Sequence, residues 1–205
     1  MEPFVEGVVS DKLGKVPVAI AIAALRQVVA TLVALLKQGV SHGDLSPANV
    51  IFAVDESAHA AGERAENTGL GLRTVLIDCG IVGPGALAYA APERFQGKHA
   101  DEKSDLFSLG LLLFRWIAGE DLVHADGYEQ FAELMANIDN VNVTEKLYAT
   151  GDFSSPEGAS SFLRWNRYGQ DFSVLMSRNA SKIWTNSMNF WKLLWTRLFM
   201  AKWLS

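Results

Sequence analysis

A nine-residue polar loop, residues 41–49, most constrains the fold, because it separates a long apolar segment from a short one. It reads Ser-His-Gly-Asp-Leu-Ser-Pro-Ala-Asn, and its glycine and proline prevent a helix from continuing. The preceding residues, 16–37, are rich in alanine and leucine and predict a helix. The following residues, 50–54, predict a short strand. Asp44 and Asn49 therefore lie at a helix-to-strand junction.

A second strand is predicted at residues 74–77, ending at Asp78. Residues 55–73 are polar and lack periodicity, so they predict a surface loop between the two strands. If the strands pair, Asp44, Asn49 and Asp78 converge on one end of a β-ribbon. Carboxylate and amide oxygens can hold Mg²⁺, and a carboxylate can orient an acceptor hydroxyl. The pattern thus favours a nucleotide–metal site.

The rest of the chain predicts a mainly α, α+β fold, in which a helical bundle carries the small ribbon. Residues 106–118 are apolar nearly all round, which is typical of a buried helix, and residues 128–138 predict an amphipathic helix. The 205 residues suffice for one domain with a substantial core.

The composition excludes some classes of function. A single cysteine, Cys79, excludes an internal disulfide framework and fits a reducing, cytoplasmic location; we expect it to be a small core residue. The net charge of -5 gives no basic footprint for nucleic acid.

The segment from Val16 to Leu36 is as apolar as a membrane span and has about the ~20 residues that one needs. Arg26 and Gln27 lie near its middle, where a charge is costly in a bilayer. A helix buried inside the protein is therefore favoured over a membrane helix.

Four short motifs follow one another along the chain. They are His42-x-Asp44-x-x-x-x-Asn49, Asp78-x-Gly80, Ala91-Pro92-Glu93 and Ser104-Asp105-x-x-Ser108-x-Gly110. Their order and spacing resemble the carboxy-terminal catalytic lobe of protein kinases. The likeness reaches back to a hinge-like Phe4-Val5-Glu6-Gly7 and fades after about residue 125.

The resemblance implies a role for each matching residue, with ATP and Mg²⁺ as the nucleotide and metal. Asp44 would be the catalytic base, and Asn49 and Asp78 the metal ligands. Nucleotide contacts would come from Phe4, Val5, Ser46 and Ile51, and structural roles would fall to His42, Gly80, Glu93 and Asp105. His42 would pack under the Asp78 turn, and Asp105, opening its helix, would bond the catalytic-loop backbone. Glu93 would pair with a late arginine, for which the candidates are Arg164, Arg167 and Arg178.

Several family features are missing from the sequence. The family's glycine-rich loop and strand lysine lie before the hinge, where this chain begins, so we expect an absent amino-terminal lobe, either truncated or supplied by another chain. Ser46 occupies the position of a family lysine that steadies the transferred phosphate. Ala86 occupies the position of a threonine that bridges that lysine to the catalytic aspartate. Gly43 replaces an arginine that binds a phosphorylated activation segment, and residues 81–90 contain no Ser or Thr. No phosphorylation switch is expected there.

The expected division is a kinase-like lobe at 1–177, with a hinge remnant at 1–7 and a catalytic core at 38–119, followed by a tail at 178–205. The tail carries five basic residues, no acidic ones and four tryptophans. A terminal packing helix is the favoured interpretation; a membrane-surface helix and a foreign reading frame are the alternatives.

Three functions fit these observations. The leading one is a Ser/Thr protein kinase lobe acting on a protein substrate, truncated and inactive alone if the missing lobe is not supplied. The second is a non-catalytic, pseudokinase-like module that binds a partner protein, favoured by Ser46 and Ala86. The third is a small-molecule phosphotransferase of the aminoglycoside or choline kinase type, suggested by His-Gly-Asp but not by the Gly85–Glu93 stretch.

Overall fold

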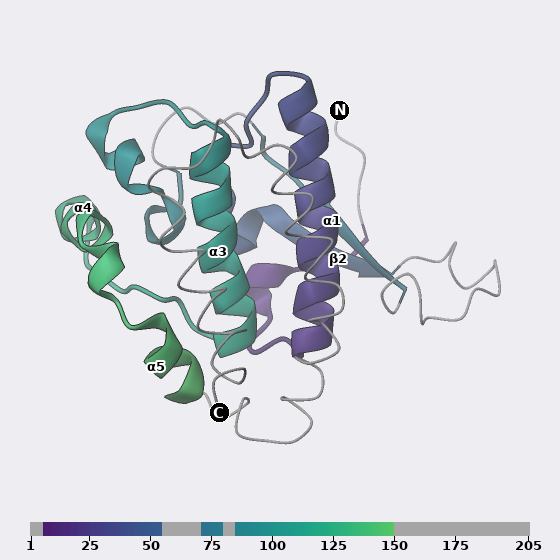
Figure 1. The fold of residues 1–205 in the computed structure, drawn as a ribbon. Coiled ribbons are helices and arrows are strands. Elements are labelled where there is room, and N and C mark those ends of the chain that lie inside the picture. The colour runs from purple at the N-terminus through teal and green to yellow at the C-terminus, as the bar shows by residue number, and fades with distance from the viewer. Residues whose placement is uncertain (1–5, 55–70, 80–84, 150–205) are drawn as a thin grey trace, which may run out of the picture. The chain divides into compact units, whose positions relative to one another are not determined.

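The computed structural model describes residues 6–54, 71–79 and 85–149. The chain divides into two compact units, residues 1–135 and 136–205. In the first unit, two long helices run side by side next to a small sheet (Figure 1). The described part is thus mainly helical with a small sheet, as the sequence predicts.

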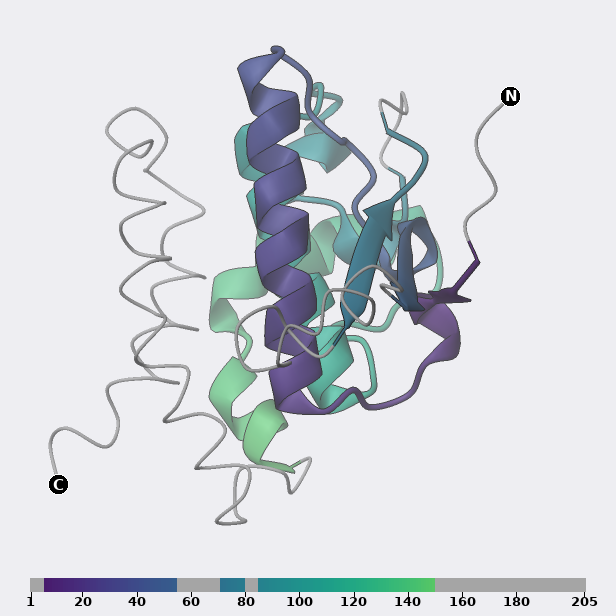
Figure 2. The same ribbon diagram turned by 90° about the vertical axis from the view of Figure 1, so that its right-hand side faces the viewer.

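Helix α1, Val18–Lys37, begins after Pro17 and is one of the two long helices. It contacts α3, Glu102–Ala118, and strand β3, Leu72–Leu76 (Figures 1 and 2). Its buried side chains recur at helical spacing: Val18, Ala21, Ala24, Leu25, Val28 and Val29. By length and hydropathy alone α1 could cross a membrane, a test that core helices of soluble proteins also pass.

Gln27 explains why a polar residue interrupts the apolar sequence of α1. Its Nε2 donates to the Leu72 carbonyl at 2.7 Å, and its Oε1 accepts from the Thr74 N–H at 2.7 Å. The side-chain amide therefore satisfies two backbone groups of β3, much as a neighbouring strand would. Gln27 joins the helix to the sheet.

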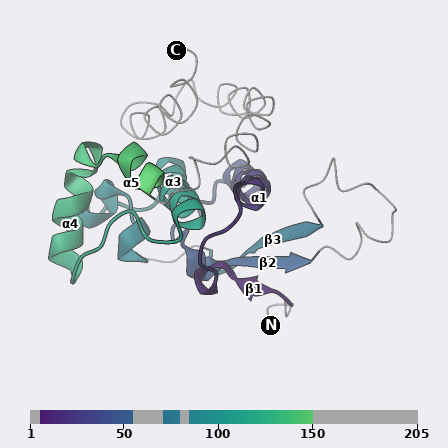
Figure 3. The ribbon, with the colours of Figure 1, turned by 90° about the horizontal axis from the view of Figure 1, so that it is seen from below.

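The sheet is antiparallel, with strand order β1-β2-β3, and Figure 3 shows α1 beside its β3 edge. Strand β2 is Val50–Val54, and Val50 pairs with Leu76 on β3, so the predicted pairing of the two strands is confirmed. A third strand, β1 at Val8–Val9, pairs with β2 and was not predicted, because two residues are too few to show a pattern.

Helix α3 begins four residues earlier than predicted. Its N-cap is Asp101, whose carboxylate accepts from the N–H groups of Lys103 and Ser104, and the Ser104 side chain returns the bond in a capping box. The first turn is polar, so hydrophobic periodicity does not reveal it. The helix ends at Gly119 with a φ of 83°.

The core of the first unit lies between the helices and the sheet. The rings of Phe52 on β2 and Trp116 on α3 meet edge to face, with centroids 5.2 Å apart. Trp116 and Phe114 are each 1 % exposed. The Val16 N–H donates to the Trp116 carbonyl at 2.7 Å, which fixes the start of α1 against the end of α3.

Short turns and helices complete the described chain. Within the first unit these are the 3₁₀ turns Ser10–Lys12, Pro47–Asn49, Leu87–Tyr89 and Pro92–Gln96, and helix α4 is Tyr128–Ala136. The second unit contains the 3₁₀ turn Ile138–Asn140 and helix α5, Val143–Ala149. The predicted tail at 178–205 lies outside the described residues.

Candidate active site

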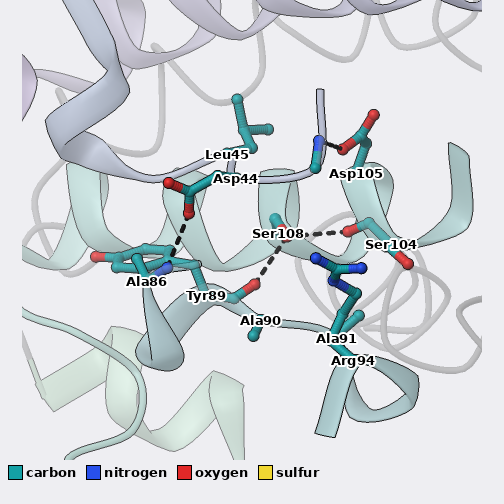
Figure 4. A pocket seen from close by; sticks show the side chains of 11 residues that line it. Asp44, Leu45, Ala86, Tyr89, Ala90, Ala91, Arg94, Ser104, Asp105 and Ser108 are labelled. Carbon is teal, nitrogen blue, oxygen red and sulfur yellow. Dashed lines mark hydrogen bonds between the residues drawn. The ribbon is translucent and has the colours of Figure 1, made fainter. Parts of the chain in front are cut away.

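Asp44 lies in the loop between α1 and the 3₁₀ turn at Pro47–Asn49. Its Oδ2 accepts a hydrogen bond from Asn49 Nδ2 at 2.9 Å. Its Oδ1 accepts one from the backbone N–H of Ala86 at 2.8 Å, which Figure 4 shows as a dashed line. Each oxygen keeps a further lone pair with which it can accept a proton or a hydrogen bond. The carboxylate is thus fixed while it remains able to act as a base.

The side chain of Asn49 has a defined orientation. Its Nδ2 lies 2.8 Å from the Asp44 carbonyl oxygen and 2.9 Å from Asp44 Oδ2, and both are acceptors, so this atom must be the amide nitrogen. Oδ1 points away from Asp44 and accepts no hydrogen bond from the described residues. Asn49 can therefore present that oxygen to a cation.

Asp78 follows β3 at the same end of the sheet. The Ile77 N–H donates to the Asn49 carbonyl at 3.1 Å, which extends the strand pairing to the residue before Asp78. Asp78 is exposed and has a φ of 57°, a left-handed conformation that aspartate adopts more readily than most residues. The convergence of Asn49 and Asp78 on one end of the ribbon is confirmed.

These two side chains suit Mg²⁺. The Asn49 Oδ1 and the Asp78 carboxylate are hard oxygen donors, and neither accepts a hydrogen bond from the residues that the structure describes. Among those residues no three His, Cys, Asp or Glu side chains form a metal-binding group. Because Mg²⁺ is usually held by one or two protein oxygens together with phosphates and water, this donor set fits a metal–nucleotide complex.

Asp105 holds the catalytic-loop backbone, as expected of it. Its Oδ2 accepts from the His42 N–H at 2.7 Å and its Oδ1 from the Gly43 N–H at 2.8 Å. Burial raises the pKa of this carboxyl above its ordinary value, although the two backbone hydrogen bonds oppose the rise. Asp105 lies within the first turns of α3, whereas the sequence analysis placed it at the helix start.

His42 is fully buried beneath the strand end and has one allowed tautomer. Its Nε2 lies 3.0 Å from the Ile77 carbonyl, which can only accept, so Nε2 carries the proton. Its Nδ1 accepts from the Asp44 N–H at 3.3 Å. The neutral imidazole therefore links the Asp44 loop to the residue before Asp78.

Glu93 accepts a hydrogen bond from the Ser104 hydroxyl at 2.7 Å. The ion pair predicted for Glu93 requires Arg164, Arg167 or Arg178, all outside the described residues. The hydrogen bond between Ser104 and Glu93 joins the Pro92–Gln96 turn to the N-terminus of α3.

The remaining predicted nucleotide contacts are partly described. Ser46 is 2 % exposed, and Ile51 is half-buried on β2 with its Cγ2 close to the backbone of Gly7. Phe4, Val5 and Gly80 lie outside the described residues. Cys79 is exposed, so its assignment to the core was wrong; it follows the strand end instead of lying within the strand.

Two features of the site were not predicted from the sequence. The first is the backbone N–H of Ala86, because every residue except proline carries this group and the sequence does not single it out. The second is a network in which the Tyr89 hydroxyl donates to Asp121, whose carboxylate lies 3.3 Å from Arg115 Nε. Burial, followed by the hydrogen bond to Asp121, raises the pKa of the Tyr89 hydroxyl well above its ordinary value. The network ties the Leu87–Tyr89 turn to the end of α3.

A carboxylate, an amide oxygen and a second carboxylate at one end of the ribbon are the groups that a phosphotransfer site requires. Residues 5–186 match the protein kinase domain family, and the chain belongs to that family. The match extends well past residue 125, where the likeness was expected to fade, so that expected limit was wrong.

Individual relatives are kinases by name, and the first of them is named a serine/threonine-protein kinase. The chain is 40 % identical over 88 residues to serine/threonine-protein kinase PknJ of Mycobacterium tuberculosis, covering 41 % of this chain and 14 % of the relative. It is 31 % identical over 150 residues to maternal embryonic leucine zipper kinase of Danio rerio, covering 71 % of this chain and 20 % of the relative. The chain therefore matches a fifth or less of the length of these two relatives.

Proposed function

We propose that this chain provides the catalytic loop and metal ligands of a Ser/Thr protein kinase that transfers the γ-phosphate of ATP to a protein hydroxyl. The observation that carries the proposal is the arrangement of Asp44, Asn49 and Asp78. Asp44 is held at both oxygens, while the Asn49 oxygen and the Asp78 carboxylate accept no hydrogen bond from the described residues. The name of the Mycobacterium tuberculosis relative, a serine/threonine-protein kinase, supports Ser and Thr as the acceptors.

In the proposed reaction Asp44 orients the acceptor hydroxyl and takes its proton. The hydroxyl oxygen bonds to the γ-phosphorus as the bond to the β–γ bridging oxygen breaks, and ADP leaves. Asn49 and Asp78 would hold Mg²⁺, which neutralises phosphate charge when it is bound. His42 and Asp105 keep the loop in place through the hydrogen bonds described above.

A non-catalytic binding module is the second candidate, favoured by two side chains. Ser46 carries no charge with which to steady a transferred phosphate, and it is 2 % exposed. Ala86 has no hydroxyl. Losing such groups weakens transition-state stabilisation but leaves the metal ligands intact.

Binding and transfer are tested separately on the full chain. Mg-ATP at a hundredfold excess over its dissociation constant should add ~2.7 kcal/mol of apparent stability to the wild type. Asp78→Ala should abolish the Mg²⁺-dependent part of the thermal shift, whereas Asp126→Ala, which removes an exposed carboxylate elsewhere in the first unit, should not.

Phosphate transfer is measured with labelled ATP and a mixture of Ser- and Thr-containing peptides. Asp44→Asn should bind Mg-ATP but transfer roughly 10²–10⁴-fold more slowly, since it lacks the base. A wild type that binds Mg-ATP but labels no peptide would favour the binding module. Absence of any Mg-ATP shift would contradict the proposed metal–nucleotide site.

A further inference from the structure

The Asp44 carboxylate is held from two distant parts of the chain. Asn49, in the same loop, donates to Oδ2 at 2.9 Å. Ala86, forty-two residues after Asp44, donates its backbone N–H to Oδ1 at 2.8 Å. Donors on both oxygens restrict rotation of the carboxylate about its Cβ–Cγ bond.

Gly85 permits the close approach of this segment to Asp44. Its φ is 66°, in the left-handed region that side chains rarely adopt. A Cβ at this position would overlap Asp44 Oδ1 and lie 2.7 Å from Asp44 Cγ. Two independent reasons, conformation and space, therefore restrict residue 85 to glycine.

The donor N–H is mounted on a turn that is anchored to α3. The Ala86 carbonyl accepts from the Tyr89 N–H at 2.9 Å, and the Tyr89 carbonyl accepts from the Ser108 hydroxyl of α3 at 2.7 Å (Figure 4). The Tyr89 hydroxyl donates to Asp121, just after α3. These bonds prevent the turn from drifting away from Asp44.

We propose that Gly85 and Ala86 are positioning residues: their backbone sets the orientation of the Asp44 carboxylate for phosphate transfer. The inference rests on the proposed function and adds a mode of control to it. Because the donor is a backbone group, neither a hydroxyl at residue 86 nor a modified side chain is needed to present it. The Ala86 N–H thus holds Asp44 without the hydroxyl that residue 86 lacks.

The kinetic test compares Gly85→Ala with Gly97→Ala. Gly97 has a φ of 77° but nothing within 4 Å of its Cβ position, so both variants carry positive-φ strain and only the first displaces Asp44. We expect kcat of Gly85→Ala to fall roughly 100-fold relative to Gly97→Ala, with the KM for ATP unchanged, since small misplacements of a reacting group have effects of this size. Equal kcat values in the two variants would overturn the positioning role.

A second pair of variants tests the same hydrogen bond and does not depend on whether Gly85→Ala folds. Ala86 has a φ of -69°, which suits proline, so Ala86→Pro removes the N–H from a residue whose φ already fits. Ala86→Ser keeps the N–H. We expect kcat of the proline variant to lie well below that of the serine variant; equal values would contradict the proposal.

Amide hydrogen exchange supplies a readout that is independent of activity. In Asp44→Ala the Ala86 amide should lose its protection, whereas the Asp105 amide, bonded to the Asp101 carbonyl, should keep it. Unchanged protection of the Ala86 amide would overturn the contact. A wild type that transfers no phosphate would instead overturn the proposed function, so the two failures are distinguishable.

Discussion

The carboxylate of Asp105 accepts hydrogen bonds from two consecutive backbone N–H groups, those of His42 and Gly43, at 2.7 and 2.8 Å. It is 5 % exposed, so water cannot readily replace it as an acceptor. Backbone donors that lose a buried partner pay the full desolvation penalty. At the scale of single residues, Asp105 is therefore the main support of the loop that carries Asp44.

Asp105→Ala should lower the free energy of unfolding by about 2–5 kcal/mol, because it leaves two N–H groups without an acceptor. Asp126→Ala, at an exposed position, should stay within about 0.5 kcal/mol of the wild type. Urea denaturation followed by circular dichroism measures both. A loss below that of an exposed substitution would show that the loop does not depend on Asp105.

The stability contributed by Asp105 should depend on pH. Burial raises the pKa of this carboxyl in the folded chain above its ordinary value of 3.8, so the folded state holds the proton more firmly than the unfolded state. This protonation-linked part of the stability is complete below pH 3.8 and is lost as the pH rises through the folded pKa, whereas the two backbone hydrogen bonds remain. The difference in unfolding free energy between the wild type and Asp105→Asn should therefore shrink over that range. A difference that grows with pH would contradict the assigned direction.

At the scale of elements, the short strand β1 illustrates a close approach that only glycine allows. A Cβ on Gly7 would lie 2.6 Å from Ile51 Cγ2 and 2.7 Å from the Phe52 carbonyl oxygen. The residues that follow, Val8 and Val9, pair with β2. The start of β1 thus lies directly against Ile51, for which a nucleotide contact was expected.

Gly7→Ala should therefore displace β1 and lower the free energy of unfolding by about 1–3 kcal/mol. Gly14→Ala is the matched control, because a Cβ there meets nothing within 4 Å and its φ is not positive. That control should be neutral or stabilising by up to about 1 kcal/mol, since alanine restricts the unfolded chain. Denaturation curves of the two variants, recorded under the same conditions, measure the difference in unfolding free energy. Equal destabilisation in both variants would count against the close approach.

At the scale of the whole molecule, α1 has to be distinguished from a membrane helix. Its buried stripe packs on α3 and β3, and Gln27 bonds two backbone groups of β3. Both observations place α1 in the core of the first unit. This packing accounts for the third of the apolar window of α1 that is buried.

Val28→Asp and Ala30→Asp separate the two roles of α1. Val28 is 0 % exposed, so an unpaired carboxylate there should cost more than about 4 kcal/mol and prevent folding. Ala30 is exposed, and aspartate there should cost about 0.7 kcal/mol through helix propensity. Soluble yield without detergent and denaturation midpoints measure the effect. A helix inside a bilayer would be damaged by both substitutions.

The sequence predicted the regular elements best where their pattern was long or strongly periodic. Strand β2 has the predicted limits, and α1 begins two residues after its predicted start. The start of α3 was missed because Asp101 and Ser104 form a polar capping box there. Strand β1 was missed because a two-residue strand is stabilised by its partner and carries no periodicity of its own.

The sequence by itself determined the family, the order of the motifs and the residue types at the site, because these depend on spacing along the chain. Only the tertiary structure decided the tautomer of His42, the orientation of the Asn49 amide and the contact between Asp44 and Ala86. The physical reason is the distance along the chain over which each effect acts. Propensity and periodicity act over a few residues, whereas a hydrogen bond between residues 44 and 86 exists only once α3 has packed and anchored the Leu87–Tyr89 turn.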